Sequence, residues 1–211
     1  MNYTIIPVTK FQQNCTILTC PETNESAIID PGGDLELLLN RIKKDKIILT
    51  KVLVTHAHLD HVGAVAELAK KFNISIEGPH KDDLFWIDAL PQQAQMFDAP
   101  IAPAFTPSRW LIQGDIVTFG NIELHVLHCP GHTPGHVVFL NKKAQLVLVG
   151  DVLFKGSIGR TDFPKGDHAM LINSIKKNLW PLDDAVQFIP GHGPMSTIGY
   201  EKRNNSFLID A

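Results

Sequence analysis

The chain lacks the features that mark several classes of protein. It has three cysteines, Cys15, Cys20 and Cys129, which include no CxxC pair and offer no disulfide framework. No run of 18 or more apolar residues occurs, and the first residues, MNYTIIPVTKFQQN, lack the basic and apolar segments of a signal peptide. We therefore expect a reduced, soluble, cytoplasmic protein. The missing signal also argues against a periplasmic antibiotic hydrolase.

An excess of charge of one sign is also lacking. The formal net charge is -3, so the chain as a whole offers no basic surface for nucleic acid or an anionic membrane, and we expect neither partner. With 211 residues, of which 44% are hydrophobic, it can bury a substantial core. Repeats, low-complexity tracts and charged linkers are absent, which predicts one domain over residues 1–211. The sequence indicates no oligomeric state.

The order of strands and helices predicts the class of fold. β-rich runs precede a helix that we expect Asp34 to cap, and later strands precede a helix that Asp167 begins, with Met170, Leu171 and Ile175 facing inward. The strands are expected at 3–8, 15–20, 26–30, 47–55, 74–77, 116–119, 122–127, 137–140, 146–149 and 186–189. The order of strands followed by a helix occurs twice, which favours an α/β (α+β) αββα sandwich over a doubly wound parallel sheet. In such a sandwich two mixed β-sheets pack face to face with helices outside.

The segment "THAHLDH" (55–61) gathers three histidines and an aspartate directly after an apolar strand. His56 and His58, two apart in an extended segment, project to the same side and could bind one metal ion. Asp60 continues the alternation, and His61 could turn with the start of a helix towards a second ion. A polar loop that contains histidines by chance is the weaker interpretation, because at this composition H-x-H-x-D-H should arise by chance in roughly one sequence in a thousand.

Three further segments have the same form, a polar residue flanked by glycine at the end of a β-rich run. They are "HCPGHTPGH" (128–136), "LVLVGD", which ends at Asp151, and "FIPGHGP" (188–194) with His192. Loops beyond strand ends are where rigid scaffolds hold reactive groups, and glycine lets the backbone approach closely. We expect all four segments to meet at one edge of the fold.

These ordered motifs make the sequence similar to the metallo-β-lactamase superfamily, and in particular to its glyoxalase II (hydroxyacylglutathione hydrolase) branch in the short bacterial form. The resemblance covers residues 55–194, and "IIDPGG" (28–33) matches the early strand and turn of the family. It implies the metallo-β-lactamase fold and two divalent metal ions per chain. Zinc is the expected ion, with iron or manganese possible.

Ligands follow from the resemblance position by position. It assigns the first metal to His56, His58 and His132. It assigns the second metal to Asp60, His61 and His192, with Asp151 bridging the two. Direct ligation is not expected of the remaining histidines, among which His136 is the best candidate to support a ligand by hydrogen bonding.

The chemistry implied is hydrolysis. Two metals can hold a bridging hydroxide at neutral pH and polarise a carbonyl, while Asp60 orients or deprotonates the water, so Asp60 and Asp151 are the candidate catalytic residues. A thiolate leaves easily because the pKa of a thiol is about 8.5. The resemblance selects a thioester substrate, S-D-lactoylglutathione or a related acyl-thiol, and a role in methylglyoxal detoxification.

The resemblance is weaker where the substrate would bind. Glyoxalase II enzymes carry a C-terminal helical domain that contacts glutathione, but only residues 193–211 follow His192, so no such domain is expected. Arg160 stands where these enzymes commonly have lysine, and Asp162 where tyrosine is usual. Arg160 and Lys155 are the candidate substrate contacts. Alternatively, Arg160 is a structural arginine paired with Asp162 or Asp167.

Two other functions remain open. "GRTDF" (159–163) also occurs in the persulfide dioxygenases of the superfamily. A resemblance to these enzymes would imply one iron ion, bound by His56, His132 and Asp151. A metal-binding module without catalysis is the alternative from another class. A β-lactamase is disfavoured by the bridging aspartate, and a nuclease by the lack of room for a further domain.

The role of residues 80–110 is also open. This irregular stretch is rich in proline and contains the large apolar residues Phe85, Trp86, Leu90, Met96 and Phe97. They could line a substrate groove or cap the core, and we expect a cap.

Overall fold

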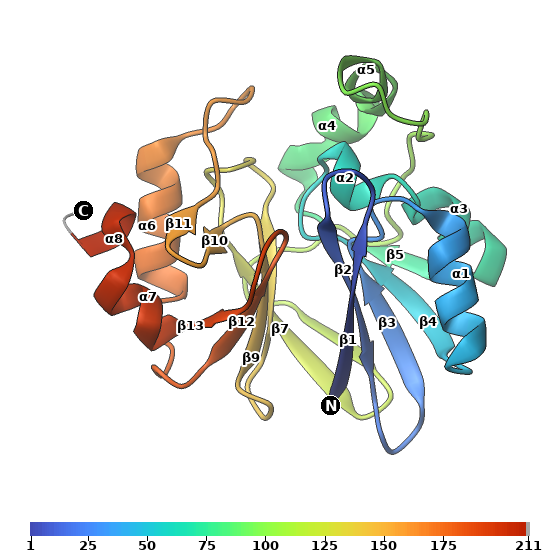
Figure 1. Cartoon of the computed structure of the whole chain (residues 1–211), viewed down its shortest axis with the longest axis horizontal. Helices are drawn as coiled ribbons and strands as arrows, with labels where there is room; N and C mark the ends of the chain where they lie inside the picture. The colour runs from blue at the N-terminus through green and yellow to red at the C-terminus, as the bar shows by residue number, and fades with distance from the viewer. Residues whose placement is uncertain (210–211) are drawn as a thin grey trace.

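Two β-sheets lie face to face at the centre of the molecule (Figure 1). The computed structural model describes residues 1–209. In order across the first sheet, the strands are β1 (Asn2–Val8), β2 (Gln13–Thr19), β3 (Glu25–Ile29), β4 (Ile48–Leu53) and β5 (Ser75–Glu77). The second sheet contains β13 (Ser196–Thr197), β12 (Gln187–Pro190), β9 (Leu146–Gly150), β8 (Val137–Asn141), β7 (Ile122–His128) and β6 (Ile116–Phe119). Parallel and antiparallel pairs occur in both, so both sheets are mixed.

Helices cover the outer faces of the two sheets, which confirms the predicted αββα sandwich (Figure 1). Outside the first sheet lie α1 (Leu35–Lys44) and α3 (Val65–Phe72). Outside the second lie α6 (His168–Asn178), α7 (Ile198–Asn204) and α8 (Ser206–Ile209). At one end of the sandwich lie α2 (Leu59–Val62), the 3-10 turn η1 (Lys81–Asp83), α4 (Leu84–Asp88) and α5 (Leu90–Met96). None of the helices within residues 1–209 has the length and apolar character needed to span a membrane.

The core has three layers because neighbouring residues of each strand point to opposite faces. In β4, Val52 packs on the helix side of the first sheet, whereas Leu53 packs between the sheets. In β8, Phe139 packs between the sheets and Val138 faces the helices of the second sheet. Strands buried on both faces explain the nearly continuous apolar runs of the sequence.

Both helices begin where the sequence predicts, but only one of the two predicted capping residues makes a capping hydrogen bond. Asp167 accepts a hydrogen bond from the backbone N–H of Met170, 2.9 Å away, as a capping residue does. Asp34 precedes α1 but makes no capping bond, because its carboxylate accepts from the N–H of Thr9 instead. The inward position predicted for Met170 is wrong: the residue is 44% exposed, and Leu171 takes the buried position of that turn.

A close backbone contact fixes the start of α2. The turn after β3 packs so tightly on this helix that a Cβ atom on Gly32 would lie 1.5 Å from the carbonyl oxygen of Asp60. The N–H of Ala64 donates to the carbonyl of Pro31 at 2.9 Å across the same contact. The Pro-Gly-Gly turn therefore determines where the end of "THAHLDH" lies.

Substitution of Gly32 by alanine should disrupt this contact. We expect Gly32→Ala to lower the free energy of unfolding by about 3 kcal/mol or more, since the new methyl group meets backbone that cannot rotate away. In the control, Gly33→Ala, the added Cβ would lie 2.4 Å from Cγ2 of Thr9, a side chain that can move, and would meet no backbone atom. Urea unfolding of both variants measures the difference, and equal losses would contradict the proposed packing.

Candidate metal centre

The motifs predicted to meet do lie at one edge of the sandwich. "THAHLDH" follows β4, His132 lies in the loop between β7 and β8, Asp151 follows β9 and His192 follows β12. The two sheets therefore both contribute side chains to the same place. Three groups of potential ligands form there, two of which correspond to the predicted sets.

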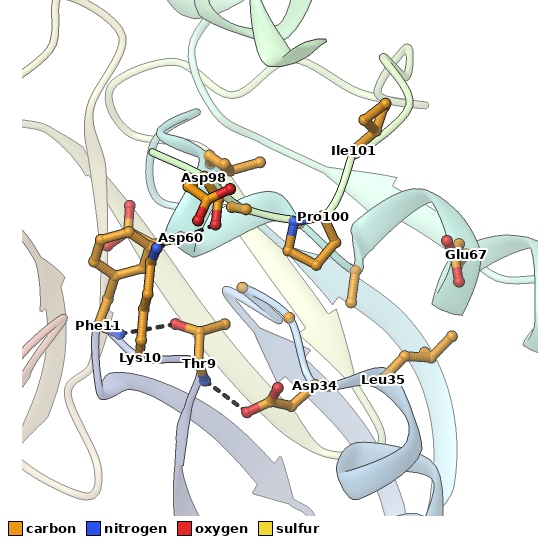
Figure 2. A pocket seen from close by; sticks show the side chains of 16 residues that line it. Thr9, Lys10, Phe11, Asp34, Leu35, Asp60, Glu67, Asp98, Pro100 and Ile101 are labelled. Atoms are coloured by element: carbon orange, nitrogen blue, oxygen red, sulfur yellow. Dashed lines mark hydrogen bonds between the residues drawn. The ribbon is translucent and has the colours of Figure 1, made fainter. Parts of the chain in front are cut away.

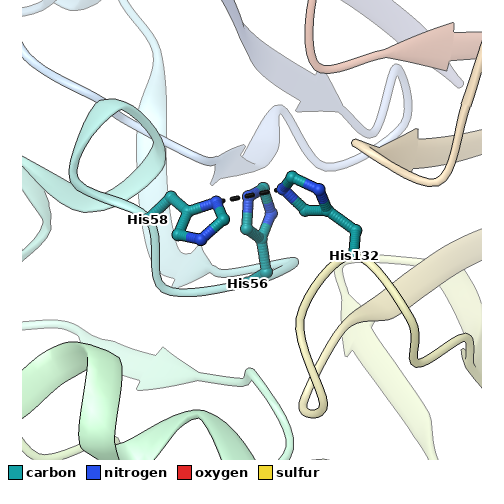
Figure 3. Close-up of side chains that lie close together, drawn as sticks. All are labelled: His56, His58 and His132. Carbon is teal, nitrogen blue, oxygen red and sulfur yellow. Dashed lines mark hydrogen bonds between the residues drawn. The ribbon is translucent and has the colours of Figure 1, made fainter. Parts of the chain in front are cut away.

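The first set consists of His56, His58 and His132, whose rings face one another (Figure 3). The centroid of the His56 ring is 4.9 Å from that of each of the other two. Nδ1 of His58 lies 3.0 Å from Nε2 of His132. All three residues are buried, and His56 is the most deeply buried of them.

The second set consists of Asp60, His61 and His192. Nε2 of His192 is 3.1 Å from Oδ2 of Asp60, and Nε2 of His61 is 3.9 Å from the same oxygen. His61 is fully buried, whereas Asp60 and His192 border the open side of the centre.

Asp151 lies between the two sets. Its Oδ2 is 3.6 Å from Nε2 of His132 in the first set and 3.7 Å from Nε2 of His192 in the second. Its Oδ1 is 3.3 Å from Nε2 of His61. A carboxylate in this position has an oxygen within reach of either set.

Four of the histidines direct Nε2 towards the centre, because Nδ1 of each ring makes a hydrogen bond elsewhere. Nδ1 of His132 donates to the carbonyl of Arg160 at 2.7 Å, and Nδ1 of His192 donates to the carbonyl of Phe11 at 3.1 Å. A carbonyl can only accept, so the proton is on Nδ1 and Nε2 keeps its lone pair for a metal. Nδ1 of His56 lies beside the hydroxyl of Thr55, and Nδ1 of His61 lies beside the carboxylate of Asp30.

Asp30 holds a histidine of each set. Its carboxylate accepts from the N–H of Thr55 at 2.7 Å and from the Thr55 hydroxyl at 2.6 Å. Because that hydroxyl proton is used, Thr55 Oγ1 accepts from Nδ1 of His56 at 3.0 Å. Nδ1 of His61 donates to Asp30 directly, also at 3.0 Å. Asp30 thereby orients His56 and His61, although it also falls within 4.8 Å of both as a potential ligand.

The residues present fit a pair of bound cations. Nε2 of His56 is buried and has no hydrogen-bond partner. Nε2 of His61 and Oδ1 of Asp151 are buried 3.3 Å apart but make no hydrogen bond of good geometry. Buried polar atoms normally have a hydrogen-bond partner, because a buried donor or acceptor without a hydrogen bond costs about 1–3 kcal/mol. Imidazole nitrogen and carboxylate oxygen are the donor atoms that zinc, iron and manganese accept. A metal ion at each set would satisfy these atoms.

The charges of the two sets differ. Burial and the neighbouring histidines lower the pKa of His58 to about 3 and that of His56 well below its usual value, so both rings are neutral. Burial opposes a charge on His61, but the carboxylates of Asp151 and Asp60 outweigh it and raise its pKa well above the usual value. Cation binding at the second set is therefore expected to release protons.

His136 supports the centre from behind. Its Nε2 accepts the backbone N–H of Asp151 at 3.0 Å, and its ring stacks on that of His56 with centroids 4.6 Å apart. The supporting position predicted for His136 is thus observed. His80, His125, His128 and His168 belong to none of the three ligand groups found within residues 1–209.

A cavity of about 630 Å³ opens over the two sets. Its walls are mainly apolar, and the lining includes the aromatic side chains Phe11, Trp86, Phe97, Phe154 and Phe163. His58, Asp60, His132, Asp151 and His192 form its floor. A second cavity, of about 460 Å³, shares Phe11, Leu59 and Asp60 with the first (Figure 2).

The two candidate substrate contacts differ in position. Arg160 lines the first cavity, where its Nε and Nη2 donate to the two carboxylate oxygens of Asp162, both at 2.6 Å. Its guanidinium also lies over the ring of Phe163, 4.1 Å from the centroid. Lys155 does not line the cavity: the turn between β10 (Leu153–Phe154) and β11 (Ser157–Ile158) directs its Nζ towards the ring of Tyr200, 5.8 Å from the centroid.

The segment that contains α4 and α5 both caps the core and lines the cavity. Leu90 is fully buried and Trp86 is 8% exposed, so the expected cap is present. Met96 and Phe97, however, form part of the cavity wall, and Met96 is 74% exposed. For these two residues, the expectation of a cap was wrong, since α5 ends over the open side of the centre.

Comparison with known proteins agrees with the geometry of the centre. The model of the metallo-β-lactamase superfamily matches residues 8–192. The chain belongs to the metallo-β-lactamase superfamily. Most members of this superfamily are hydrolases. The resemblance drawn from the four motifs is thereby confirmed.

Similar proteins of the superfamily match this chain over nearly its whole length. Hydroxyacylglutathione hydrolase GloC of Haemophilus influenzae is 49% identical over 209 residues, which cover 99% of this chain and 98% of that protein. The structure of BLEG-1 B3 metallo-beta-lactamase has a TM-score of 0.91 and 36% identity, covering 98% of this chain and 99% of that one. The structure of TTHA1623 in a di-iron-bound form has a TM-score of 0.89 and 36% identity, covering 97% and 100%.

The role of Asp30 was not predicted from the sequence. The residue stands at the end of β3, before Pro31 and two glycines, in the same strand-end form as the predicted ligands. That form is a signal that could have identified it. Its partners lie elsewhere in the chain, Thr55 in the loop after β4 and His61 in α2, so the pairing itself required the structure.

Asp30→Asn should reverse the tautomer of His61. If the amide NH2 group faces His61, then Nδ1 must accept and Nε2 carries the proton, which removes the lone pair needed by a metal. We expect about 10- to 100-fold weaker binding of the second zinc ion, measured by competition with a chelator. Asp34→Asn, in the same turn but without a histidine partner, is the control. Unchanged binding in Asp30→Asn would refute this role.

Proposed function

We propose that this protein is a metal-dependent thioester hydrolase of the glyoxalase II type, acting on S-D-lactoylglutathione or a related acyl-thiol. The observation that carries the proposal is the pair of ligand sets with Asp151 between them at the floor of an open cavity. The 49% identity to a protein named hydroxyacylglutathione hydrolase supports the choice of substrate.

The ligand sets would hold two divalent ions, His56, His58 and His132 one of them, and Asp60, His61 and His192 the other. Such ions supply a water nucleophile at neutral pH and polarise a carbonyl group. Asp151 would contact both. Burial opposes ionisation of Asp60, but His61 and His192 lower its pKa, so its carboxylate is ionised and can orient a water molecule at the floor of the cavity.

The cavity suits an acyl-thiol. Its apolar walls, among them Trp86, Phe154 and Phe163, would cover the sulfur and the methylene groups of the thiol and exclude bulk water. A thiolate needs little proton donation on leaving, because the pKa of a thiol is about 8.5. This agrees with a cavity floor that offers carboxylates and metal-directed imidazoles. The lining residues include no cysteine, and the hydroxyl of the serine among them, Ser157, donates to the carbonyl of Ile158 at 3.4 Å.

The same centre could serve a persulfide dioxygenase, which would need one iron on His56, His132 and Asp151 only. The presence of Asp60, His61 and His192 as a second group of potential ligands favours two bound ions and hence the hydrolase. A similar protein was described in a di-iron-bound form, so the identity of the metal does not by itself separate the two functions.

An assay of the purified protein separates the candidates. We expect loss of the thioester absorbance with S-D-lactoylglutathione in a sample that contains close to two metal ions per chain. Oxygen uptake on glutathione persulfide with one iron per chain would replace the proposal by the dioxygenase. Metal without either reaction would indicate a binding module. A β-lactam substrate belongs in the same series, because BLEG-1 is named a B3 metallo-beta-lactamase.

Asp151→Ala tests the bridging position. Removal of the carboxylate between the sets should lose a metal ion and nearly all turnover, a fall in kcat of at least about 100-fold. Asp88→Ala, which removes an exposed carboxylate of α4, should leave both unchanged. Metal analysis and kinetics on the same preparations measure this effect. Normal turnover in Asp151→Ala would exclude a bridging role.

Arg160→Ala tests the predicted substrate contact. Since Asp162 occupies two of the guanidinium donors, we expect a rise in KM of about 10-fold or less, with kcat little changed. Lys155→Ala, outside the cavity, should have no effect. Steady-state kinetics give kcat and KM for both variants. Equal changes in KM would mean that Arg160 makes no specific contact with the substrate.

A further inference from the structure

Gln93 is a buried polar residue of α5 to which the reaction assigns no part. The residue is 4% exposed, and its side-chain amide makes three hydrogen bonds to backbone groups. Nε2 donates to the carbonyl of Trp86 at 2.8 Å and to that of Ala57 at 3.3 Å. Oε1 accepts from the N–H of Leu59 at 2.9 Å. Ala57 and Leu59 are the two residues that flank His58.

The bond to Leu59 replaces a missing helix cap. The first N–H groups of a helix have no partner within it, and the residue before the helix usually supplies one. His58 precedes α2 but makes no side-chain cap, because its ring faces His132 in the first ligand set. Gln93 caps the helix from another element and leaves the imidazole of His58 free for a metal.

A second side chain from the same segment holds the other face of this loop. Oδ2 of Asp83 accepts from the N–H of Ala57 at 3.0 Å and from the hydroxyl of Thr133 at 2.9 Å. Its Oδ1 accepts from the N–H of Gly135 at 2.6 Å. Asp83 therefore joins the loop of His58 to the loop of His132, and Gln93 completes the support of the peptide groups on both sides of His58.

We propose that Gln93 is a positioning residue for the first metal set, which it serves by fixing the backbone on both sides of His58. The inference rests on the proposed metal centre. It gives α5 two roles, since the helix that contributes Met96 to the cavity wall also holds a ligand loop. Gln92, its neighbour, also lines the cavity but is exposed and bonds to neither Ala57 nor Leu59.

The test measures zinc affinity directly. Zinc-free preparations of the wild type, Gln93→Leu and Gln92→Leu are titrated with Zn²⁺ against a chromophoric chelator, and their thermal unfolding is followed without zinc. Leucine keeps the volume of Gln93 but leaves the peptide groups around His58 without their partners. We expect Gln93→Leu to bind zinc about 10- to 100-fold more weakly, whereas Gln92→Leu binds like the wild type.

A further variant separates positioning from folding. Gln93→Glu keeps an acceptor for Leu59 but has at most one proton to donate to the carbonyls of Ala57 and Trp86. We expect its zinc affinity to lie between those of the wild type and Gln93→Leu. If Gln93→Leu does not fold, the comparison is made with this variant.

The possible outcomes distinguish the two proposals. A wild-type chain that binds no zinc would overturn the proposed centre. Wild-type zinc affinity in Gln93→Leu and Gln93→Glu, even with a lower melting temperature, would overturn the positioning role and leave the centre intact. Equal weakening in Gln92→Leu would also overturn it, because the loss would then come from the cavity wall.

Discussion

The proposed metal centre depends on the buried carboxylate of Asp30. Its hydrogen bonds to Thr55 and to Nδ1 of His61 set the ring nitrogen that each set presents, since Thr55 passes the constraint on to His56. A single charged group thus orients one histidine of each set. Three donors satisfy this buried carboxylate, the N–H and hydroxyl of Thr55 and Nδ1 of His61. The close packing of Gly32 on Asp60 then keeps the remaining ligands of the loop in register with it.

The layered fold explains why these groups meet. The first sheet supplies Asp30 and the loop of His56 to His61, whereas the second sheet supplies Asp151 and His192 from strand ends. Packing of the sheets face to face brings these ends together, so the ligand geometry follows from the hydrophobic core between Leu53 and Phe139 as much as from the loops. Assembly of the centre and folding of the sandwich are therefore linked.

The sequence predicted those parts of the fold and centre that depend on local pattern. The apolar runs marked the strands, and spacing placed His56 and His58 on one side of an extended segment. The full set of proposed ligands came from the family resemblance. Contacts between distant segments could not be predicted in this way. The bond from Gln93 to Leu59, the bidentate pairing of Arg160 with Asp162 and the outward position of Met170 all depend on how elements pack. The polar support of a site is therefore harder to predict than its ligands.

The most direct test is a crystal structure of the zinc-loaded protein with anomalous scattering recorded at the zinc edge. The account predicts two separate peaks, one at bonding distance from His56, His58 and His132, the other at bonding distance from Asp60, His61 and His192, with Asp151 contacting both. Asp30 should keep its bonds to Thr55 and His61. A single peak, or two peaks bound by other residues, would contradict the central claim.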